Sequence, residues 1–392
     1  MHGHHHGTPQ SRAARHQRVA TRRTRLLLGS AVGLLLALTV AGLVALWPDG
    51  TRLPHPDFAA PGATFPHGTV AAVAAAPCPG GAAGARCGEA TVRVDEGVDE
   101  GRVVRVAVPP DVMAAGVGEG VVLVRTPSAG QASYALQDLD RSRPLVMLAG
   151  AFVIVVLLVA RWRGALALLG LGVAAVVMVT FMLPALLAGE NPVLVALTAS
   201  AAIMIVVLYL AHGLSVRTTT ALLGTFAGLT LTAGIALWSV GGAHLTGISN
   251  DDSALLRQQV SGLSAQDLLL CGIVLAGLGV LNDVTITQSS AVWELRAAAP
   301  SLTRGALFAK AMRIGRDHIA STIYTIVFAY AGAALSVLML IVLYGQPLSF
   351  TLTSNDIAEE VVRTLATSIG LVLAVPITTG LAVLVTPRPA RT

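Results

Sequence analysis

The chain has 392 residues, of which 54% are hydrophobic and only 12% are charged, and its formal net charge is +5. A soluble domain carries about twice that share of charged residues, so the composition predicts a protein that crosses a membrane several times. Lys310 is the sole lysine and no glycine-rich loop precedes it, which excludes a P-loop ATPase.

Residues 1–25 are rich in arginine and are predicted to form a disordered, basic cytoplasmic tail. The apolar run that follows, Leu26–Trp47, is predicted to be the first transmembrane helix (residues 26–47). It is too long for the core of a signal peptide, and no small-residue cleavage site follows it. We therefore expect this helix to stay in the protein as an anchor.

Residues 48–143 are predicted to form a β-rich extracytoplasmic domain between the first and second spans. Turn residues separate five short runs rich in β-branched side chains, and some of these runs alternate polar and apolar residues. This pattern indicates a small closed barrel, OB-like or SH3-like. No aromatic stacking platform is present, so nucleic acid is not an expected ligand. Cys78 and Cys87 lie in this domain, and outside the cell a disulfide between them is favoured over two free thiols.

Residues 144–386 are predicted to form a seven-helix transmembrane domain, and residues 387–392 a cytoplasmic tail. The predicted spans are Leu145–Ala160, Ala165–Leu187, Val193–Ala211, Thr219–Val240, Leu268–Ser290, Ile319–Tyr344 and Leu365–Thr386. The fold class is thus an all-α polytopic membrane protein of about eight helices with one β-rich domain. Gly224 and Gly228 predict a close helix–helix contact, and Cys271 is predicted to be a packing residue.

The distribution of basic residues predicts the topology. With the N-terminus inside, sixteen Arg and Lys residues fall in segments on the cytoplasmic side, whereas the short outer loops hold only Arg257 and Arg363. We therefore expect a multi-pass protein of the plasma (cell) membrane with both termini in the cytoplasm. The lipid bilayer is its expected environment.

One predicted span contains a stripe of polar residues. Asp283, Thr287, Ser290 and Glu294 recur at intervals of three and four residues, so they share one face of a helix. An ionisable residue at membrane depth is costly unless it has a partner or water. Asp283 is therefore the primary candidate for a functional residue.

The beginning of the seventh predicted span has two interpretations. Arg313, Arg316, Asp317 and His318 are compatible with an ordinary charged helix start at the membrane surface. They are equally compatible with a pathway mouth, in which Asp283 or Glu294 pairs with Arg313 or Arg316. The sequence leaves both interpretations open.

Acidic residues also precede the last span, in the segment from Asn355 to Arg363. A solvated helix start, with Glu359 and Arg363 paired at i, i+4, is favoured over a vestibule that attracts cations. The spacing E-E-V-V-R does not fit an intramembrane CAAX-type peptidase.

Three segments together resemble a known family: G-x-L-N-D-V-x-x-x-Q-S-S-A-V-x-E-L, I-G-R-D-H-I-A-S-T-I-Y-T-I-V-F-A-Y-A-G and E-E-V-V-R-x-L-x-x-S-I-G-L-V-L-x-V-P-I-T-T. The chain resembles the YibE/F-like family of bacterial multi-pass membrane proteins over about residues 65–386. The resemblance implies an anchor, an outer β-rich segment and seven further spans, and it implies little about activity.

The leading functional hypothesis is a transporter or permease for an ion or small solute, with Asp283 binding a cation. The predicted pathway residues are Asn282, Asp283, Thr287, Gln288, Ser290, Glu294, Arg316, Asp317 and Thr325. The alternative is a non-catalytic scaffold of the cell envelope that docks a partner protein or a second copy of itself. No nucleophile–base pair and no metal-spaced set is found at one depth, so no catalytic site, metal or cofactor is expected.

Overall fold

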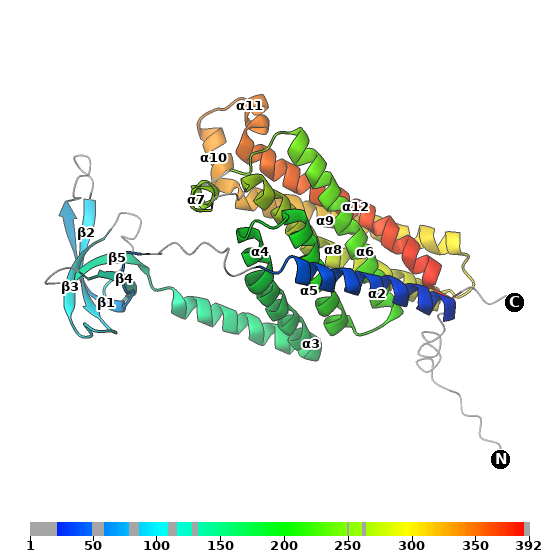
Figure 1. Ribbon diagram of the computed structural model, residues 1–392, viewed down its shortest axis with the longest axis horizontal. Coiled ribbons are helices and arrows are strands. Elements are labelled where there is room, and N and C mark those ends of the chain that lie inside the picture. Colours follow the sequence, from blue (N-terminus) through cyan, green and yellow to red (C-terminus); the bar gives the residue numbers. More distant parts are fainter. Residues whose placement is uncertain are drawn as a thin grey trace, which may run out of the picture. The chain divides into compact units, whose positions relative to one another are not determined.

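The computed structural model describes residues 22–48, 59–77, 86–108, 116–127, 132–248, 251–260 and 264–387. These residues form two compact units. One lies within His55–Trp162, and the other combines Met1–Pro54 with Arg163–Thr392. The first contains the β-strands, and the second is a bundle of helices (Figure 1).

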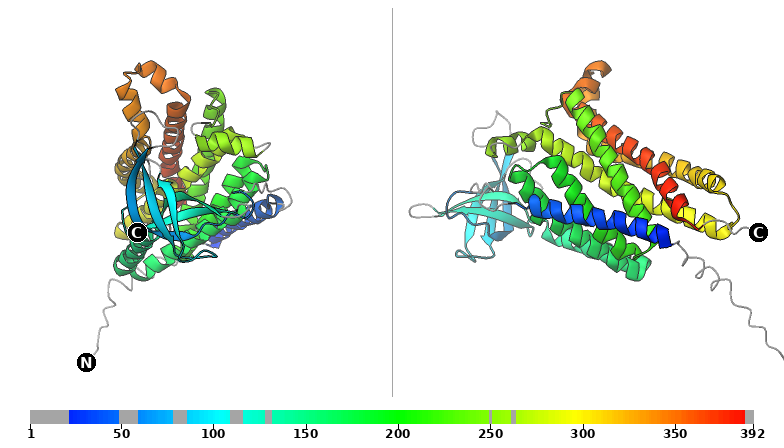
Figure 2. Two further views of the ribbon diagram at one scale, coloured as in Figure 1. Left: turned by 90° about the vertical axis from the view of Figure 1, so that its left-hand side faces the viewer. Right: turned by 45° about the vertical axis from the view of Figure 1, so that its right-hand side comes forward.

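The strands form one antiparallel sheet that curls into a nearly closed barrel (Figure 2). The strands are β1 His67–Pro77, β2 Arg86–Val94, β3 Val103–Val108, β4 Gly120–Thr126 and β5 Ser133–Leu139. Their spatial order is β3-β2-β1-β4-β5, and the two end strands β3 and β5 also touch. Because β4 returns to lie beside β1, the strands have the Greek-key order that OB-type barrels share.

The core of the barrel follows from side-chain alternation. In β3, Val104, Val106 and Val108 point inward and are buried, while the residues between them are exposed. Bulges in β1 and β5 bend those strands and help the sheet to close. The predicted barrel is confirmed. Cys78, however, lies outside the described residues, as does the side chain of Cys87, so the disulfide remains a prediction.

The helices lie in chain order as follows: α2 Arg22–Ala45, α3 Ser142–Val177, a π-helical turn Met178–Met182, α4 Leu183–Leu187, α5 Pro192–His212, α6 Val216–Gly242, α7 Asp251–Gln259, α8 Ala265–Ala298, α9 Arg304–Ala333, α10 Leu335–Leu343, α11 Leu348–Thr353 and α12 Asn355–Val385. Local side chains define several helix starts. Asn191, Ser215 and Thr303 each accept a hydrogen bond from a backbone amide in the first turn of α5, α6 and α9.

Six helical segments of the described chain are long and apolar enough to cross a membrane, or seven if a bent pair is counted as one span. One segment, Ser142–Leu187, has 46 residues and breaks at Arg161, where φ is 54°. At about 1.5 Å per residue each side of this break can cross an apolar layer of about 30 Å. The total of eight spans therefore remains a prediction.

The predicted seventh span, Ile319–Tyr344, is not one continuous helix. α9 ends at Ala333 and α10 begins at Leu335, and the two helix axes differ in direction by 66°. Gly332 lies two residues before the break at Ala334, but a single glycine within an apolar run does not by itself predict a bend of this size.

The centre of the bundle is formed by α6, α8 and α12, with α5 and α9 packed beside them (Figure 1). The contact between α6 and α12, here called the glycine seam, depends on residues without side chains. Thr378 lies against Gly224, Ala374 against Gly228, and Thr232 against Gly370. A β-carbon at Gly224 or Gly370 would overlap the opposing threonine. The predicted packing role of Gly224 and Gly228 is thus confirmed.

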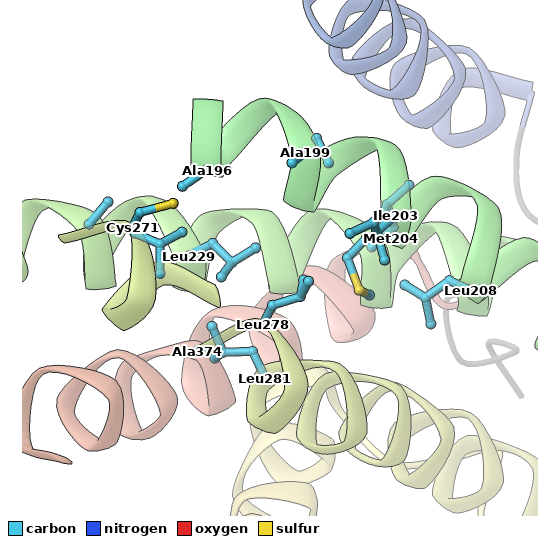
Figure 3. Packing of buried hydrophobic residues seen from close by; sticks show 14 of the residues in the cluster. Ala196, Ala199, Ile203, Met204, Leu208, Leu229, Cys271, Leu278, Leu281 and Ala374 are labelled. Atoms are coloured by element: carbon cyan, nitrogen blue, oxygen red, sulfur yellow. The ribbon is translucent and has the colours of Figure 1, made fainter. Parts of the chain in front are cut away.

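Apolar side chains of four helices fill the rest of the interior. Figure 3 shows Leu229 of α6, Leu278 and Leu281 of α8 and Ala374 of α12 gathered beside the small residues of α5. Cys271 is buried in this cluster as a free thiol, in agreement with its predicted packing role.

Candidate functional site

Contacts between α8 and α6 define the level of Asp283 in the bundle. Leu281 packs against Gly228, and Thr285 Oγ1 lies 2.6 Å from Thr225 Oγ1. Asp283 is therefore level with the α6 residues between 225 and 228, near the middle of this 27-residue helix. α6 is a candidate span by its length and composition, and Asp283 lies level with its middle.

The polar stripe of α8 faces away from the bundle. The side chain of Asp283 is 77% exposed, Thr287 and Glu294 are also exposed, and Ser290 is half-buried. Thr287 donates a hydrogen bond of 2.7 Å to the carbonyl of Asp283, and Ser290 donates one of 2.7 Å to the carbonyl of Ile286. These hydroxyls thus satisfy themselves on their own helix, whereas the two carboxylates do not.

The opposite face of α8 carries a second polar set, which is buried. Gln288 Nε2 donates to Thr379 Oγ1 at 2.7 Å and to the carbonyl of Ala311 at 3.0 Å. Ser289 Oγ donates to the carbonyl of Arg217 at 2.9 Å. These bonds connect α8 to α6, α9 and α12. The structure does not bring Gln288 together with Asp283, because the two side chains leave the helix in different directions.

Asn282 lies between these two faces. It is half-buried, and its Oδ1 atom is buried without a hydrogen-bond partner among the described residues. An amide oxygen in this condition is costly at membrane depth.

The predicted ion pairs between α8 and α9 are not found. Within the described ranges, neither Asp283 nor Glu294 lies within ion-pair distance of Arg313 or Arg316. Instead, His318 Nε2 lies 3.9 Å from Asp283 Oδ2. His318 Nε2 is buried and makes no hydrogen bond in the described structure. An acid and an imidazole therefore face each other at the level of the middle of α6.

The remaining α9 candidates lie at the surface of the unit. Arg316, Asp317 and Thr325 are all exposed, and Thr325 donates to the carbonyl of Ser321 at 3.2 Å. No cluster of three or more His, Cys, Asp or Glu residues able to hold a metal ion occurs in the described part of the chain.

The approach of His318 to Asp283 was not predicted from the sequence, although the short loop between the two helices indicates it. The loop between α8 and α9 is short, so the two helices form an antiparallel hairpin. Residues at equal distances from the turn near residue 301 then face each other, which places His318 opposite Asp283.

A second polar group holds the beginning of α12. Glu359 is only 2% exposed, and its Oε1 accepts a hydrogen bond of 2.8 Å from Asn355 Nδ2. Asn355 also donates to the carbonyl of Ile248 and accepts from the hydroxyl of Thr246. The interpretation of this segment as a solvated helix start is therefore wrong for Glu359. The predicted pair between Glu359 and Arg363 is also wrong.

The charge of Arg363 is instead directed at Glu360, whose Oε1 lies 3.5 Å from Arg363 Nη1. Close to this group, a cavity of about 390 Å³ lies between the end of α6, α7 and the beginning of α8. Its polar lining residues are Thr246, Arg257, Ser264 and Gln266.

Comparison with known protein families identifies the bundle. The model of the family described as YibE/F-like protein matches residues 148–388, more than half of the chain. The chain belongs to the YibE/F-like family. Searches of curated proteins and of solved structures found no match.

The YibE/F-like match begins in α3 and continues past the end of α12. It includes Asp283, His318, Glu359 and the glycine seam, whereas the barrel and α2 precede it. Several apolar helices and the family together identify a membrane protein.

Proposed function

We propose that this YibE/F-like protein is a transporter that moves a small cation across the membrane, with Asp283 as the group that binds and releases it. The observation that carries the proposal is the approach of His318 Nε2 to within 3.9 Å of Asp283 Oδ2 on the outward face of α8, level with the middle of α6. Ionisable residues at this depth are rare, and in pumps and transporters Asp, Glu and His residues form proton and ion relays.

The chemistry of the pair suits such a role. Histidine is the residue type that most readily changes charge near neutral pH, and a carboxylate binds a proton or a metal cation. The imidazole is too distant for a hydrogen bond and would form one after a small movement of either side chain. A cation bound at Asp283 would then compete with this hydrogen bond.

A route for the cation is suggested by the outward face of α8. Thr287, Ser290 and Glu294 continue from Asp283 toward one end of the helix, and the small residues Gly272, Ala276 and Gly279 continue toward the other end. Glu294 and the exposed charges Arg316 and Asp317 of α9 lie on the side of the helix turn.

Flux measurements in proteoliposomes test the proposal. A trapped pH-sensitive dye reports proton movement while a gradient of Na⁺, K⁺, Mg²⁺ or Ca²⁺ is imposed. The wild type is expected to give a signal above that of empty vesicles, and Asp283→Asn is expected to reduce its rate at least tenfold. Asp267→Asn makes the same change at the start of the same helix and is expected to keep the rate. Equal rates for wild type and Asp283→Asn would contradict the role of Asp283.

A second candidate function is a non-catalytic envelope scaffold. It is favoured by the interior of the bundle, where Thr225 is hydrogen-bonded to Thr285 and Gln288 donates to Thr379. Labelling with a soluble thiol reagent separates the two functions. A transporter labels Thr287→Cys and spares the buried Gly277→Cys, whereas a dry scaffold labels neither.

We further propose eight spans, both termini in the cytoplasm of a bacterial cell and the barrel outside the plasma membrane. The excess of arginine in the segments assigned to the cytoplasm supports this orientation. A cysteine introduced at Ser133 in the barrel should react with an impermeant thiol reagent in intact cells. Reaction only after lysis would reverse the orientation.

A further inference from the structure

We propose that a second copy of this chain covers the outward face of α8 and α9, so that Asp283 of each copy faces protein rather than lipid. This face, here called the α8–α9 face, consists of the small and polar residues of α8 on the side of Asp283, from Gly272 to Glu294, which are exposed or half-buried, and the exposed charged residues of α9 from Lys310 to Asp317. The inference does not depend on transport, because it follows from the properties of this surface.

The first argument is the cost of leaving Asp283 in lipid. An acidic side chain at the middle of a spanning helix costs roughly 3 kcal/mol when it faces the bilayer. The exposed fraction of 77% shows that the bundle itself does not cover Asp283, and His318 approaches it from one side only. A single chain therefore leaves this site incomplete.

The second argument is that the α8–α9 face carries both acidic and basic residues without ion-pair partners. The exposed charged residues of the face, apart from Asp283, are Glu294, Lys310, Arg313, Arg316 and Asp317. None of them forms an ion pair with another residue that the structure describes. The acid Glu294 lies on α8, whereas α9 carries the three basic residues and the single acid Asp317, so that α9 is net basic on this face.

This division of charge makes the face complementary to itself. A two-fold axis places α8 of one copy against α9 of the other, so that Glu294 of each copy faces the basic residues of its partner. A different partner protein would need to supply the same alternation. Charge complementarity therefore favours a second copy as the occupant.

The third argument is the shape of α8. Nothing lies within 4 Å of the position that a β-carbon would take at Gly272 or Gly279. Small residues on the lipid-facing side of a helix allow a second helix to approach closely, which is the main source of association energy in membranes. The residues that permit this approach lie on the same helix face as Asp283.

Disulfide cross-linking in native membranes tests the proposal directly. The three native cysteines are replaced, and one cysteine is introduced at Gly279 or at Thr287. Both variants are expected to form a product of twice the chain mass on oxidation. Gly380→Cys on α12, where the β-carbon position is also open, serves as the matched control and is expected to remain monomeric. No cross-link at either α8 position, or a product of another mass, would overturn the proposal.

A charge reversal keeps the proposal falsifiable if the cysteine variants fold poorly. Glu294→Arg is expected to weaken dimerisation about tenfold, measured as the dissociation constant in nanodiscs by single-molecule photobleaching, which corresponds to about 1.4 kcal/mol. Asp356→Arg reverses an exposed acid at the start of α12 and is expected to leave the constant unchanged. Equal constants for both variants, or a wild type that is monomeric at every density, would contradict a dimer through this face.

Discussion

The barrel and the α8–α9 face treat charged residues in opposite ways. In the barrel, Asp99 accepts hydrogen bonds from Tyr134 at 2.5 Å and from Arg125 at 2.7 Å, and Arg141 lies 2.7 Å from Asp138. On the α8–α9 face, Asp283 has only a histidine at 3.9 Å, and Glu294 has no ion-pair partner among the described residues.

This difference is informative because a charged partner contributes less to stability in water, where the barrel has one, than at membrane depth, where the α8–α9 face lacks one. Ion pairs exposed to water contribute little, so the barrel would lose little without the pair of Arg141 and Asp138. A charge at membrane depth gains much from a partner, and there the described residues supply only His318, beyond hydrogen-bond distance of Asp283. The barrel is therefore complete in one chain, whereas the α8–α9 face gains its partners from outside the chain.

The largest change in the free energy of unfolding is expected in the bundle interior, where Gln288 already has hydrogen-bond partners. Gln288→Leu removes the bonds to Thr379 and to the carbonyl of Ala311 and should reduce the free energy of unfolding by about 1–2 kcal/mol. Thr287→Val, one residue away on the outward face, should change it by less than about 0.5 kcal/mol. Unfolding of the detergent-solubilised protein by SDS measures both, and equal losses would contradict the division of α8 into two faces.

A smaller and pH-dependent effect is expected in the barrel. The hydrogen bond from Tyr134, with the bond and charge of Arg125, holds the pKa of Asp99 below its ordinary value of 3.8. A lowered pKa means that the carboxylate stabilises the fold above pH 3.8, and that this stabilisation is lost as the pH falls through the lower folded value. Asp99→Asn should therefore destabilise the barrel at pH 7 and have no effect in strong acid.

Hydrogen exchange of the β4–β5 segment in the full chain measures this effect. Wild type and Asp99→Asn should exchange at different rates at pH 7 and converge as the pH drops below about 3.8, once intrinsic rates are corrected. A difference that persists unchanged in acid would show that the aspartate acts by packing and not by its charge.

The smallest effect on stability is expected at Asp283. In monomeric protein held in detergent, Asp283→Asn should change the free energy of unfolding by less than about 0.5 kcal/mol, because the side chain has no hydrogen bond to lose. SDS unfolding measures this change. A large loss would show that His318 already pairs with Asp283 and would remove the contrast with the barrel.

Much of the architecture was predictable because local patterns determine it. The alternation of Val104, Val106 and Val108 specifies a half-buried strand, and the spacing of Gly224 and Gly228 specifies a close helix contact. The spacing of Asp283 and Thr287 likewise showed that they share a helix face.

The direction of that face was not predictable. Helical spacing says which residues lie together, but a polar stripe is compatible with a wet interior and with an outward surface. Only the packing of α6 and α9 shows that Gln288 points inward and Asp283 outward. The burial of Glu359 also escaped prediction, because its neighbour Asn355 is held by Thr246 and Ile248, more than 100 residues earlier in the chain.

The glycine seam has a mechanical consequence. Each helix inserts a threonine against a glycine of the other: Thr232 of α6 against Gly370, and Thr378 of α12 against Gly224. Rotation or sliding of one helix against the other would therefore cause a steric clash. These two helices are expected to act as one rigid strut. A rearrangement of the bundle would then involve movement of α9 and α10. These helices meet at the bend beside Ala334 and expose most of their side chains.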